Sequence, residues 1–210
     1  MKRFYKSIPQ ITMCLMLTLF ILSCNTEDVS TTQDYSEASL YELIEANTSY
    51  STNAKAAPKK GAEPIAAVAI NAGSFNELVA ALMYVDEQLD AGLVDLFLNG
   101  TDQFTVFAPN DDAFNALYGA LGVSGITDLD AGLVLQVLQY HVTTGRRASN
   151  SVVPRNGMRT IETLLPEATF DVYPDLSIMA IGNSANILAA DISASNGIIH
   201  VIDSVILPIE

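Results

Sequence analysis

Two histidines are the residues of this sequence whose side chains are best suited to acid–base or nucleophilic chemistry. They are His141 and His200, and Asp112, Asp203 or Ser204 could in principle complete a nucleophile–base arrangement with either of them. The motifs that normally mark such sites are missing, because the sequence has no Gly-x-Ser-x-Gly elbow, no His-Glu-x-x-His and no phosphate-binding glycine-rich loop. Each catalytic template therefore lacks its nucleophile or its metal. We expect a protein that is not an enzyme.

Pairs of aspartates could suggest a calcium site. The candidates are Asp111-Asp112 and Asp128-Leu129-Asp130, but an EF-hand loop also needs a third ligand, a glycine at its sharp turn and a Glu in register. Helix capping accounts for these aspartates instead. Both cysteines of the chain, Cys14 and Cys24, lie near the N-terminus, so the remainder offers neither a disulfide nor a cysteine zinc site. We expect no metal and no cofactor.

Cys24 follows a segment with the features of a secretory leader. Lys2, Arg3 and Lys6 make its start basic, and residues 11–22 form an apolar run shorter than the ~20 residues that a membrane-spanning helix needs. The run ends in Ile21-Leu22-Ser23-Cys24, which resembles the lipobox of bacterial lipoproteins. The resemblance implies that residues 1–23 are a lipoprotein signal peptide and that Cys24 is lipidated. The alternative is an ordinary signal peptide with a chance cysteine.

The residues that follow Cys24 have the composition of a tether. Residues 24–63 are rich in Ser, Thr, Asn, Ala and Glu, and a flexible chain of this length reaches ~35 Å from end to end. Asn25-Thr26-Glu27-Asp28 loosely resembles the acidic surface-export signals of Bacteroidetes lipoproteins. We therefore expect export through the inner membrane and lipid anchorage in the cell envelope, in the outer membrane and with exposure at the cell surface.

The charge distribution argues against nucleic acid and singles out one segment. The formal net charge is −14, and loss of the three basic leader residues would lower it to −17, so phosphate backbones would be repelled. From Ile65 onward the chain carries 17 acidic residues and only four basic ones. These four are Arg146, Arg147, Arg155 and Arg159. They predict a positive patch that could bind acidic polysaccharide or lipopolysaccharide phosphate, unless they pair with the domain's own carboxylates.

The elements that must position these residues are organised around residues 104–114. Phe104 to Phe107 alternate as a strand covered on both faces, and Pro109 ends that strand. Asn110 is a favoured N-cap, and Asp111 and Asp112 place negative charge at the start of the helix that follows. An apolar stripe on this helix then packs against the sheet; it comprises Phe114, Leu117, Tyr118 and Leu121.

Helices are expected on both sides of this strand, and strands in the last third of the chain. Ser74 and Glu77 predict a capping box at the start of a first helix. A second helix is expected at residues 86–98, and Asp128 or Asp130 is expected to cap a helix that ends near Tyr140. Short apolar or alternating runs predict strands at residues 151–153, 158–164, 169–173, 176–181, 186–192 and 198–207. Asn196-Gly197 predicts a hairpin before the last, central strand. Early helices and late strands indicate an α+β domain.

Three ordered motifs resemble those of the fasciclin family. Residues 104–114 are similar to its first homology motif, Leu138 to Val142 to its Tyr-His motif, and Asn196 to Pro208 to its second homology motif. The resemblance spans Pro64 to Pro208, with Asn110 in place of the usual Thr and Asp112 in place of the usual Glu. It implies one domain, residues 64–210, folded as a wedge-shaped β-sandwich with helices packed along one side.

The resemblance also implies roles for motif residues and a function. His141, Asp112 and Asp203 would be structural, with His141 donating a hydrogen bond inside the fold, whereas Tyr140 lies in a segment linked to adhesion in animal relatives and is a candidate partner-binding residue. The expected function is a lipid-anchored adhesion or interaction module without catalysis, whose partner is an extracellular protein or an acidic polysaccharide. The alternative is a carrier of a small apolar ligand, lipid or pigment, in a cleft of the sandwich; a cavity of ~300 Å³ or more would favour it.

Overall fold

A computed structural model of the chain describes residues 59–209. The predicted signal peptide, Cys24 and nearly all of the predicted tether lie outside these residues. Among residues 59–209 no single helix has both the length and the apolar character needed to cross a membrane. One pair of helical segments meets the criterion jointly, Asp111–Asp128 with Ala131–Tyr140, but it is bent by 112°.

The strands form one seven-stranded sheet in the order β2-β1-β7-β6-β5-β4-β3. Only β1 and β7 pair in parallel, and the other neighbours are antiparallel. The strand β7 lies inside the sheet and is buried along its length, which confirms the predicted central position of the last strand, although it ends at Ile202. The strands are β1 Phe104–Pro109, β2 Val142–Thr144, β3 Arg159–Glu162, β4 Thr169–Val172, β5 Ser177–Met179, β6 Ser184–Ala194 and β7 Gly197–Ile202.

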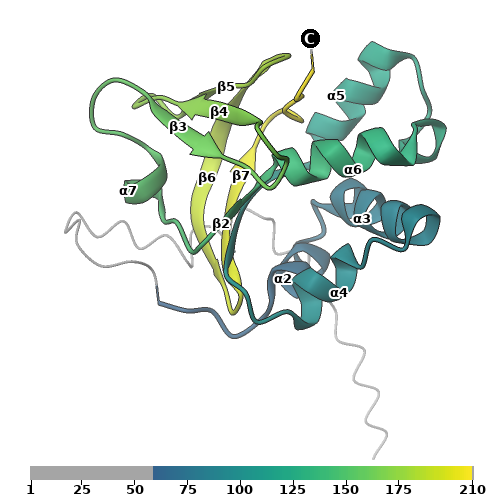
Figure 1. The fold of residues 1–210 in the computed structure, drawn as a ribbon, viewed down its shortest axis with the longest axis horizontal. Coiled ribbons are helices and arrows are strands. Elements are labelled where there is room, and N and C mark those ends of the chain that lie inside the picture. Colours follow the sequence, from purple (N-terminus) through teal and green to yellow (C-terminus); the bar gives the residue numbers. More distant parts are fainter. Residues whose placement is uncertain (1–58, 210) are drawn as a thin grey trace, which may run out of the picture. The chain divides into compact units, whose positions relative to one another are not determined.

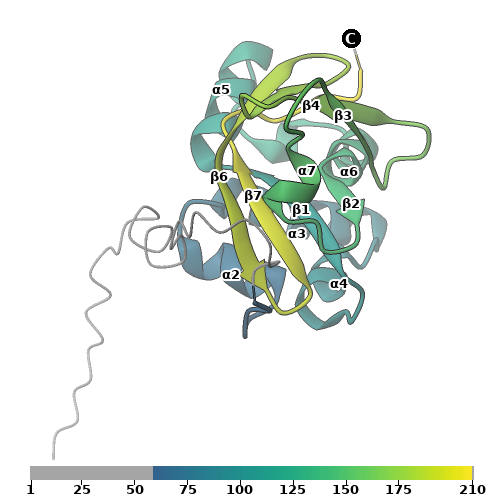
Figure 2. The same cartoon turned by 90° about the vertical axis from the view of Figure 1, so that its left-hand side faces the viewer.

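The sheet folds over on itself at β6, which belongs to both halves (Figure 2). The register of β6 against β7 shifts twice between Ile187 and Ile192, and Asp191 has a left-handed backbone with φ of 67°. Such irregularities bend a strand and increase its twist, which brings the two halves face to face. Apolar side chains fill the wedge between them, including Phe107, Phe170, Ile161, Ile178 and Ile202.

Helices cover the other face of β1 and β7, so that the domain is α+β with its main helices on one side (Figure 1). A second core lies between these helices and the sheet, and Phe104, Val106, Phe114, Leu138 and Val201 belong to it. The helices are α2 Ile65–Ala72, α3 Asn76–Leu89, α4 Leu93–Asn99, α5 Asp111–Leu121, the 3-10 turn η1 Ile126–Asp128, α6 Ala131–Tyr140 and α7 Ser149–Val152. The small helix α7 lies apart from the others, on the sheet side.

The junction of β1 and α5 forms as the local sequence predicts. The side chain of Asn110 accepts a hydrogen bond from the Ala113 N–H at 3.0 Å, so Asn110 is the N-cap of α5. Of the two residues predicted to cap α6, Asp128 and Asp130, Asp130 is the cap, and it accepts from the Leu133 N–H at 2.9 Å. In both cases the cap and its donor are three residues apart, a contact that the sequence alone specifies.

The predicted capping box at Ser74 and Glu77 is wrong. The Ser74 hydroxyl is buried without a hydrogen-bond partner among the described residues. The Glu77 N–H donates instead to the Asp111 carboxylate at 2.9 Å, and the Glu77 carboxylate accepts from the Tyr118 hydroxyl at 2.9 Å. The start of α3 is thus stabilised by α5 and not by its own residues. Burial and the bond to Glu77 raise the pKa of Tyr118, so its hydroxyl stays protonated as a donor.

Two other predicted elements need correction, and one helix was missed. The expected helix 86–98 is divided between α3 and α4, because the chain turns at Asp90 and Gly92, which both have positive φ. The Asp86 carboxylate caps α4 by accepting hydrogen bonds from the Leu93 and Val94 N–H groups at 2.7 and 2.8 Å. The expected strand 151–153 overlaps α7. The helix α2 was not predicted, since its eight residues carry no capping side chain and no polar face.

Candidate functional site

His141 ends α6 and joins this helix to the chain that follows β7. Its Nδ1–H donates to the Val137 carbonyl at 2.7 Å, and its Nε2 accepts from the Ile206 N–H at 3.0 Å. The ring is buried, and this desolvation lowers the pKa of His141 to about 4, so the imidazole is neutral at physiological pH. Both ring nitrogens are occupied by backbone groups, which leaves neither free to move a proton to or from a substrate.

His200 is held in the same way within the sheet. Its Nε2–H donates to the Arg147 carbonyl at 2.9 Å, and its Nδ1 accepts from the Asp191 N–H at 3.3 Å. Burial again lowers the pKa of His200 below its ordinary value. The ring therefore fixes the bulged part of β6 and the residues after β2 against β7, at a site where Phe107 stacks on it with a ring separation of 5.4 Å.

The acidic residues considered with the histidines have other contacts. Asp203 accepts from the Asn186 N–H at 2.7 Å and from the Asn186 side-chain amide at 2.9 Å, which closes β6 onto the end of β7. Asp112 is exposed in the first turn of α5, where its charge complements the helix dipole. Within residues 59–209 no group of three His, Cys, Asp or Glu side chains could hold a metal ion.

Tyr140 does not reach the surface, so its assignment as a partner-binding residue is wrong. Its side chain is fully buried in the wedge between the two halves of the sheet. The hydroxyl donates to the Thr169 carbonyl at 2.7 Å and accepts from the Ile181 N–H at 3.3 Å. Tyr140 and His141 therefore point to opposite cores from adjacent positions, Tyr140 to the wedge and His141 to the helical side.

The four arginines do not form one surface patch. Arg146 is an internal clamp, whose guanidinium donates to the carbonyls of Ala194, Gly197 and Lys59 and to the Ser193 hydroxyl. Partial burial lowers the pKa of Arg146, which remains charged because arginine titrates far above neutrality. Arg146 thus fastens the hairpin between β6 and β7 to the chain that enters the domain, and its assignment as a partner-binding residue is wrong.

The other three arginines are more accessible. Arg147 is half-buried and donates to the Thr144 carbonyl at 3.1 Å, whereas Arg155 and Arg159 are exposed. Arg159 donates to the Ser151 carbonyl at 2.6 Å. Arg147 and Arg159 donate to backbone carbonyls, and Arg146 donates to backbone carbonyls and a serine hydroxyl. The alternative expectation of pairing with carboxylates therefore does not describe these three side chains either. The positive charges of Arg155 and Arg159 are exposed and could contact an external anion.

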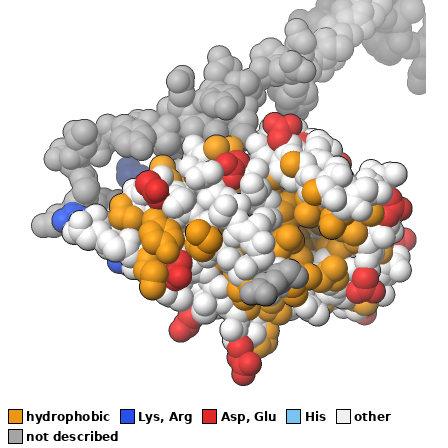
Figure 3. Space-filling model, turned by 90° about the horizontal axis from the view of Figure 1, so that it is seen from above, with side chains coloured by type: hydrophobic (Ala, Val, Ile, Leu, Met, Phe, Trp, Pro, Cys, Tyr) orange, Lys and Arg blue, Asp and Glu red, His pale blue; other side chains and the backbone are white. Residues whose placement is uncertain are grey.

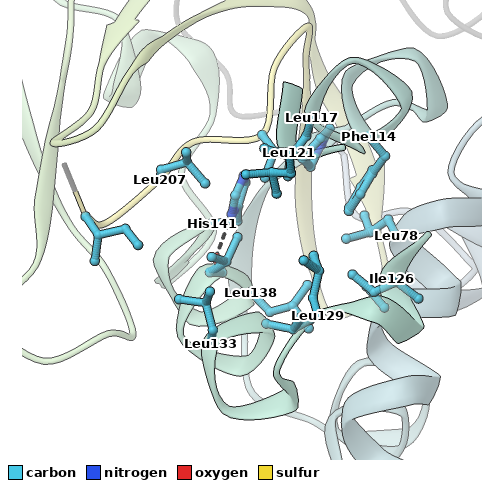
Figure 4. Close-up of a pocket in the computed structure, with 16 residues that line it drawn as sticks. Leu78, Phe114, Leu117, Leu121, Ile126, Leu129, Leu133, Leu138, His141 and Leu207 are labelled. Atoms are coloured by element: carbon cyan, nitrogen blue, oxygen red, sulfur yellow. Dashed lines mark hydrogen bonds between the residues drawn. The ribbon is translucent and has the colours of Figure 1, made fainter. Parts of the chain in front are cut away.

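A groove between helices was not predicted from the sequence. Its walls come from α3, α5, α6 and the chain after β7, and we call it the α5–α6 groove (Figure 4). It encloses about 110 Å³. Its lining residues are Leu78, Ala81, Pro109, Phe114, Leu117, Leu121, Ile126, Leu129, Leu133, Val134, Val137, Leu138, His141, Val205, Leu207 and Ile209.

The chemistry of the α5–α6 groove is almost purely apolar. His141 is the single titratable side chain in its lining, and the bond from His141 to Val137 is drawn in Figure 4. Leu121 is 53% exposed and Ile209 is 48% exposed, so the groove opens to solvent, and Figure 3 shows hydrophobic side chains around this hollow. The sequence carried one signal of it: Leu133 and Val137 widen the apolar surface of α6 beyond what one buried stripe needs, and the apolar Leu129 lies just before this helix.

Comparison with known proteins assigns most of the domain to one family profile. The fasciclin domain profile matches residues 73–208. Protein sll1483 of Synechocystis sp. is 36% identical over 144 residues, which is 69% of this chain and 73% of that protein. Immunogenic protein MPB70 of Mycobacterium bovis is 32% identical over 149 residues, 70% of this chain and 69% of that protein.

A solved structure is also similar. It is a FAS1 domain pair from the insect cell adhesion molecule Fasciclin I, with a TM-score of 0.45 and 20% sequence identity. The match covers 63% of this chain and 45% of the insect chain.

Proposed function

We propose that this chain, which belongs to the fasciclin family, is a noncatalytic adhesion or interaction module of the cell envelope. The observation that carries the proposal is the α5–α6 groove, an apolar surface open to solvent whose one titratable side chain, His141, has both nitrogens engaged. Such a surface can bind through the hydrophobic effect, but it offers no group that could act on what it binds.

The size of the groove favours a protein partner. Its volume of about 110 Å³ accommodates one or two apolar side chains, whereas pockets for small molecules enclose roughly 300–1,000 Å³. Leu121 and Ile209 at its rim would then surround an inserted side chain and exclude water from it. The apolar lining of the groove is also compatible with a carrier of a small apolar ligand, but the groove is too small to enclose such a ligand. The carrier is therefore our second candidate function.

The location of the module is part of the proposal. The lipobox-like Ile21 to Cys24 supports lipidation of Cys24, and residues 24–63 would hold the domain clear of an outer membrane. The exposed Arg155 and Arg159 support contact with an anionic component of that envelope. Together these features support a surface-exposed module that links the envelope to an extracellular protein.

The experiment that tests the proposal compares groove variants in a pull-down from envelope extracts. Leu121→Gln removes an apolar rim residue, and because Leu121 is half exposed the fold should tolerate the change. The neighbouring exposed Ala120→Gln is the matched control, since Ala120 does not line the groove. We expect a protein partner that the unmodified chain and Ala120→Gln retain and Leu121→Gln loses. Equal retention by all three chains would remove the groove from the function, and capture of a lipid or pigment in its place would favour the carrier.

A further inference from the structure

The charges of the domain are separated along the chain and in space. Residues 65–145, which include helices α2 to α6, carry ten acidic residues and no basic one. All four arginines of the domain come later, and Arg155 and Arg159 lie in and beside the loop between α7 and β3. In Figure 1 this loop is at the left-hand end of the domain, opposite the helices. Residues 146–210 carry seven acidic residues beside the four arginines, so a negatively charged surface would repel the helical side more strongly than the end with Arg155 and Arg159.

The same end exposes large apolar side chains. Met158 is 58% exposed and Leu188 is 56% exposed, and Leu176 lies at the turn between β4 and β5 with 39% exposure. The Tyr173 hydroxyl, at the end of β4, contacts the Met158 sulfur at 3.8 Å. The Ile187 N–H, next to Leu188, donates to the Leu176 carbonyl at 2.9 Å. Figure 3 shows hydrophobic side chains beside the few basic ones at its left-hand end.

Leu176 carries a further signal. Its φ of 71° lies in the left-handed region, which is unfavourable for a leucine and costless for a glycine. Its side chain is not part of either core, so packing does not compensate. Glycine or asparagine would adopt this backbone conformation at lower cost than leucine. The exposed part of the Leu176 side chain is therefore a candidate for contact outside the domain.

Two acidic groups near this end, the exposed Asp175 and the half-buried Asp171, accept hydrogen bonds from neighbouring residues. The Asp175 carboxylate, next to Leu176, accepts from the Ser177 N–H at 3.1 Å and from the Ser177 hydroxyl at 2.6 Å. The Asp171 carboxylate accepts from the Thr160 hydroxyl at 2.6 Å. Arg155 is exposed three residues before Met158 and makes no such contact among the described residues.

We infer that this end of the domain, the β-tip surface, contacts a lipid bilayer that carries anionic phospholipid head groups. The β-tip surface consists of Arg155, Met158, Arg159, Tyr173, Leu176 and Leu188. Apolar side chains at a loop tip with adjacent arginines match the interface of such a bilayer, where hydrocarbon lies directly below anionic charge. An acidic polysaccharide would satisfy the arginines but would leave Met158, Leu176 and Leu188 in water. The contact rests on the membrane location proposed above, and it orients the helical side with the α5–α6 groove away from the lipid.

The test places a reporter in the β-tip surface of the full chain. Met158→Cys is labelled with a polarity-sensitive fluorophore, and the protein is reconstituted into vesicles that contain a lipid-borne quencher. The vesicles consist of phosphatidylcholine alone or of phosphatidylcholine mixed with anionic phosphatidylglycerol. Ala120→Cys on α5 is the matched control, and labelled unmodified chain gives the background from Cys14 and Cys24. We expect quenching at position 158 in the anionic vesicles only, and none at position 120 in either.

Two further variants separate the contributions. Arg155→Gln with Arg159→Gln should lower the affinity for anionic vesicles by roughly 25-fold, since each basic residue near the surface contributes about fivefold. Leu176→Gly should raise the melting temperature by relieving the left-handed leucine and should reduce quenching at position 158. If Leu176 does not contact lipid, Leu176→Gly will change the melting temperature and leave the quenching at position 158 unchanged.

Failure of this inference and failure of the anchorage are distinguishable. Chain that stays with the vesicles but is quenched equally at positions 158 and 120 overturns the β-tip contact and leaves the anchorage intact. Quenching at position 158 by protein whose Cys24 carries no lipid supports the β-tip contact and overturns the anchorage. Protein that neither stays with the vesicles nor shows quenching overturns both the β-tip contact and the lipid anchorage. Protein that pellets equally well without vesicles also overturns both, because contacts between chains then explain the pelleting.

Discussion

The Nε2 atom of His141 accepts a hydrogen bond from the backbone N–H of Ile206 at 3.0 Å, across 65 positions of sequence. The other ring nitrogen bonds within α6, to the Val137 carbonyl. One neutral imidazole therefore joins the end of α6 to the chain after β7, the two segments that contain the second and third of the recognised motifs. The Tyr-His motif and the second homology motif are connected through this ring.

Replacing His141 by Ala should lower the free energy of unfolding by about 1–3 kcal/mol, because the buried Ile206 N–H and Val137 carbonyl each lose a partner. Chemical denaturation at pH 7 measures the change. A melt that does not move, together with loss of partner binding, would assign His141 a binding role instead.

The stability of the unmodified domain should fall as the pH is lowered from 6.5 to 4. The unfolded chain protonates His141 near its ordinary pKa of 6.5, whereas the folded domain resists protonation until about pH 4, so the unfolded state binds more protons in this window. The loss is on the order of 3 kcal/mol for the full shift, complete below pH 4 and absent above pH 6.5. His141→Ala should remove this part of the slope. Parallel pH curves for the two proteins would show that the shift is too small to matter.

Arg146→Gln and Arg155→Gln should have different effects on folding. The first variant removes charged donors from the Ala194 and Gly197 carbonyls and should cost about 1–3 kcal/mol, whereas the exposed Arg155 should cost little. Thermal melts of the two variants provide the comparison. Equal melting temperatures would contradict the clamp role of Arg146.

Asp86→Ala should destabilise the domain by about 1–2 kcal/mol, since its carboxylate caps two N–H groups at the start of α4. The adjacent Glu87→Ala is the control, because Glu87 is exposed and makes no such contact. The midpoints of denaturant unfolding compare the two variants. An equal, small change for both would show that the cap at Asp86 does not stabilise the domain.

Cys24→Ser should release the protein from the membrane fraction while the domain remains folded, because Cys24 lies about 40 residues before Pro64 and outside the described fold. Fractionation and metabolic labelling with a fatty-acid analogue test this. Uptake of no label by the unmodified protein, with the variant still bound to membrane, would contradict the anchor.

Local chemistry was enough to predict the parts of the fold whose contacts span a few residues. The strand Phe104–Pro109, the cap at Asn110, the cap at Asp130 and the hairpin before Gly197 follow from side-chain periodicity and from caps and turns that bond to their own neighbours. The three motifs in their order then indicated the family, and with it the α+β architecture.

Contacts between distant residues decided the rest. Asn196 was predicted for its turn chemistry, yet its side chain accepts from the Ile65 N–H, 131 positions away, and donates to the Phe97 carbonyl. Asp111 caps α3, Tyr140 points into the wedge, Arg146 binds the β6–β7 hairpin, and the α5–α6 groove forms where α5, α6 and the chain after β7 meet. None of these is encoded by spacing, because a side chain's partner depends on which segments the bent sheet and its helices bring within hydrogen-bond or van der Waals reach.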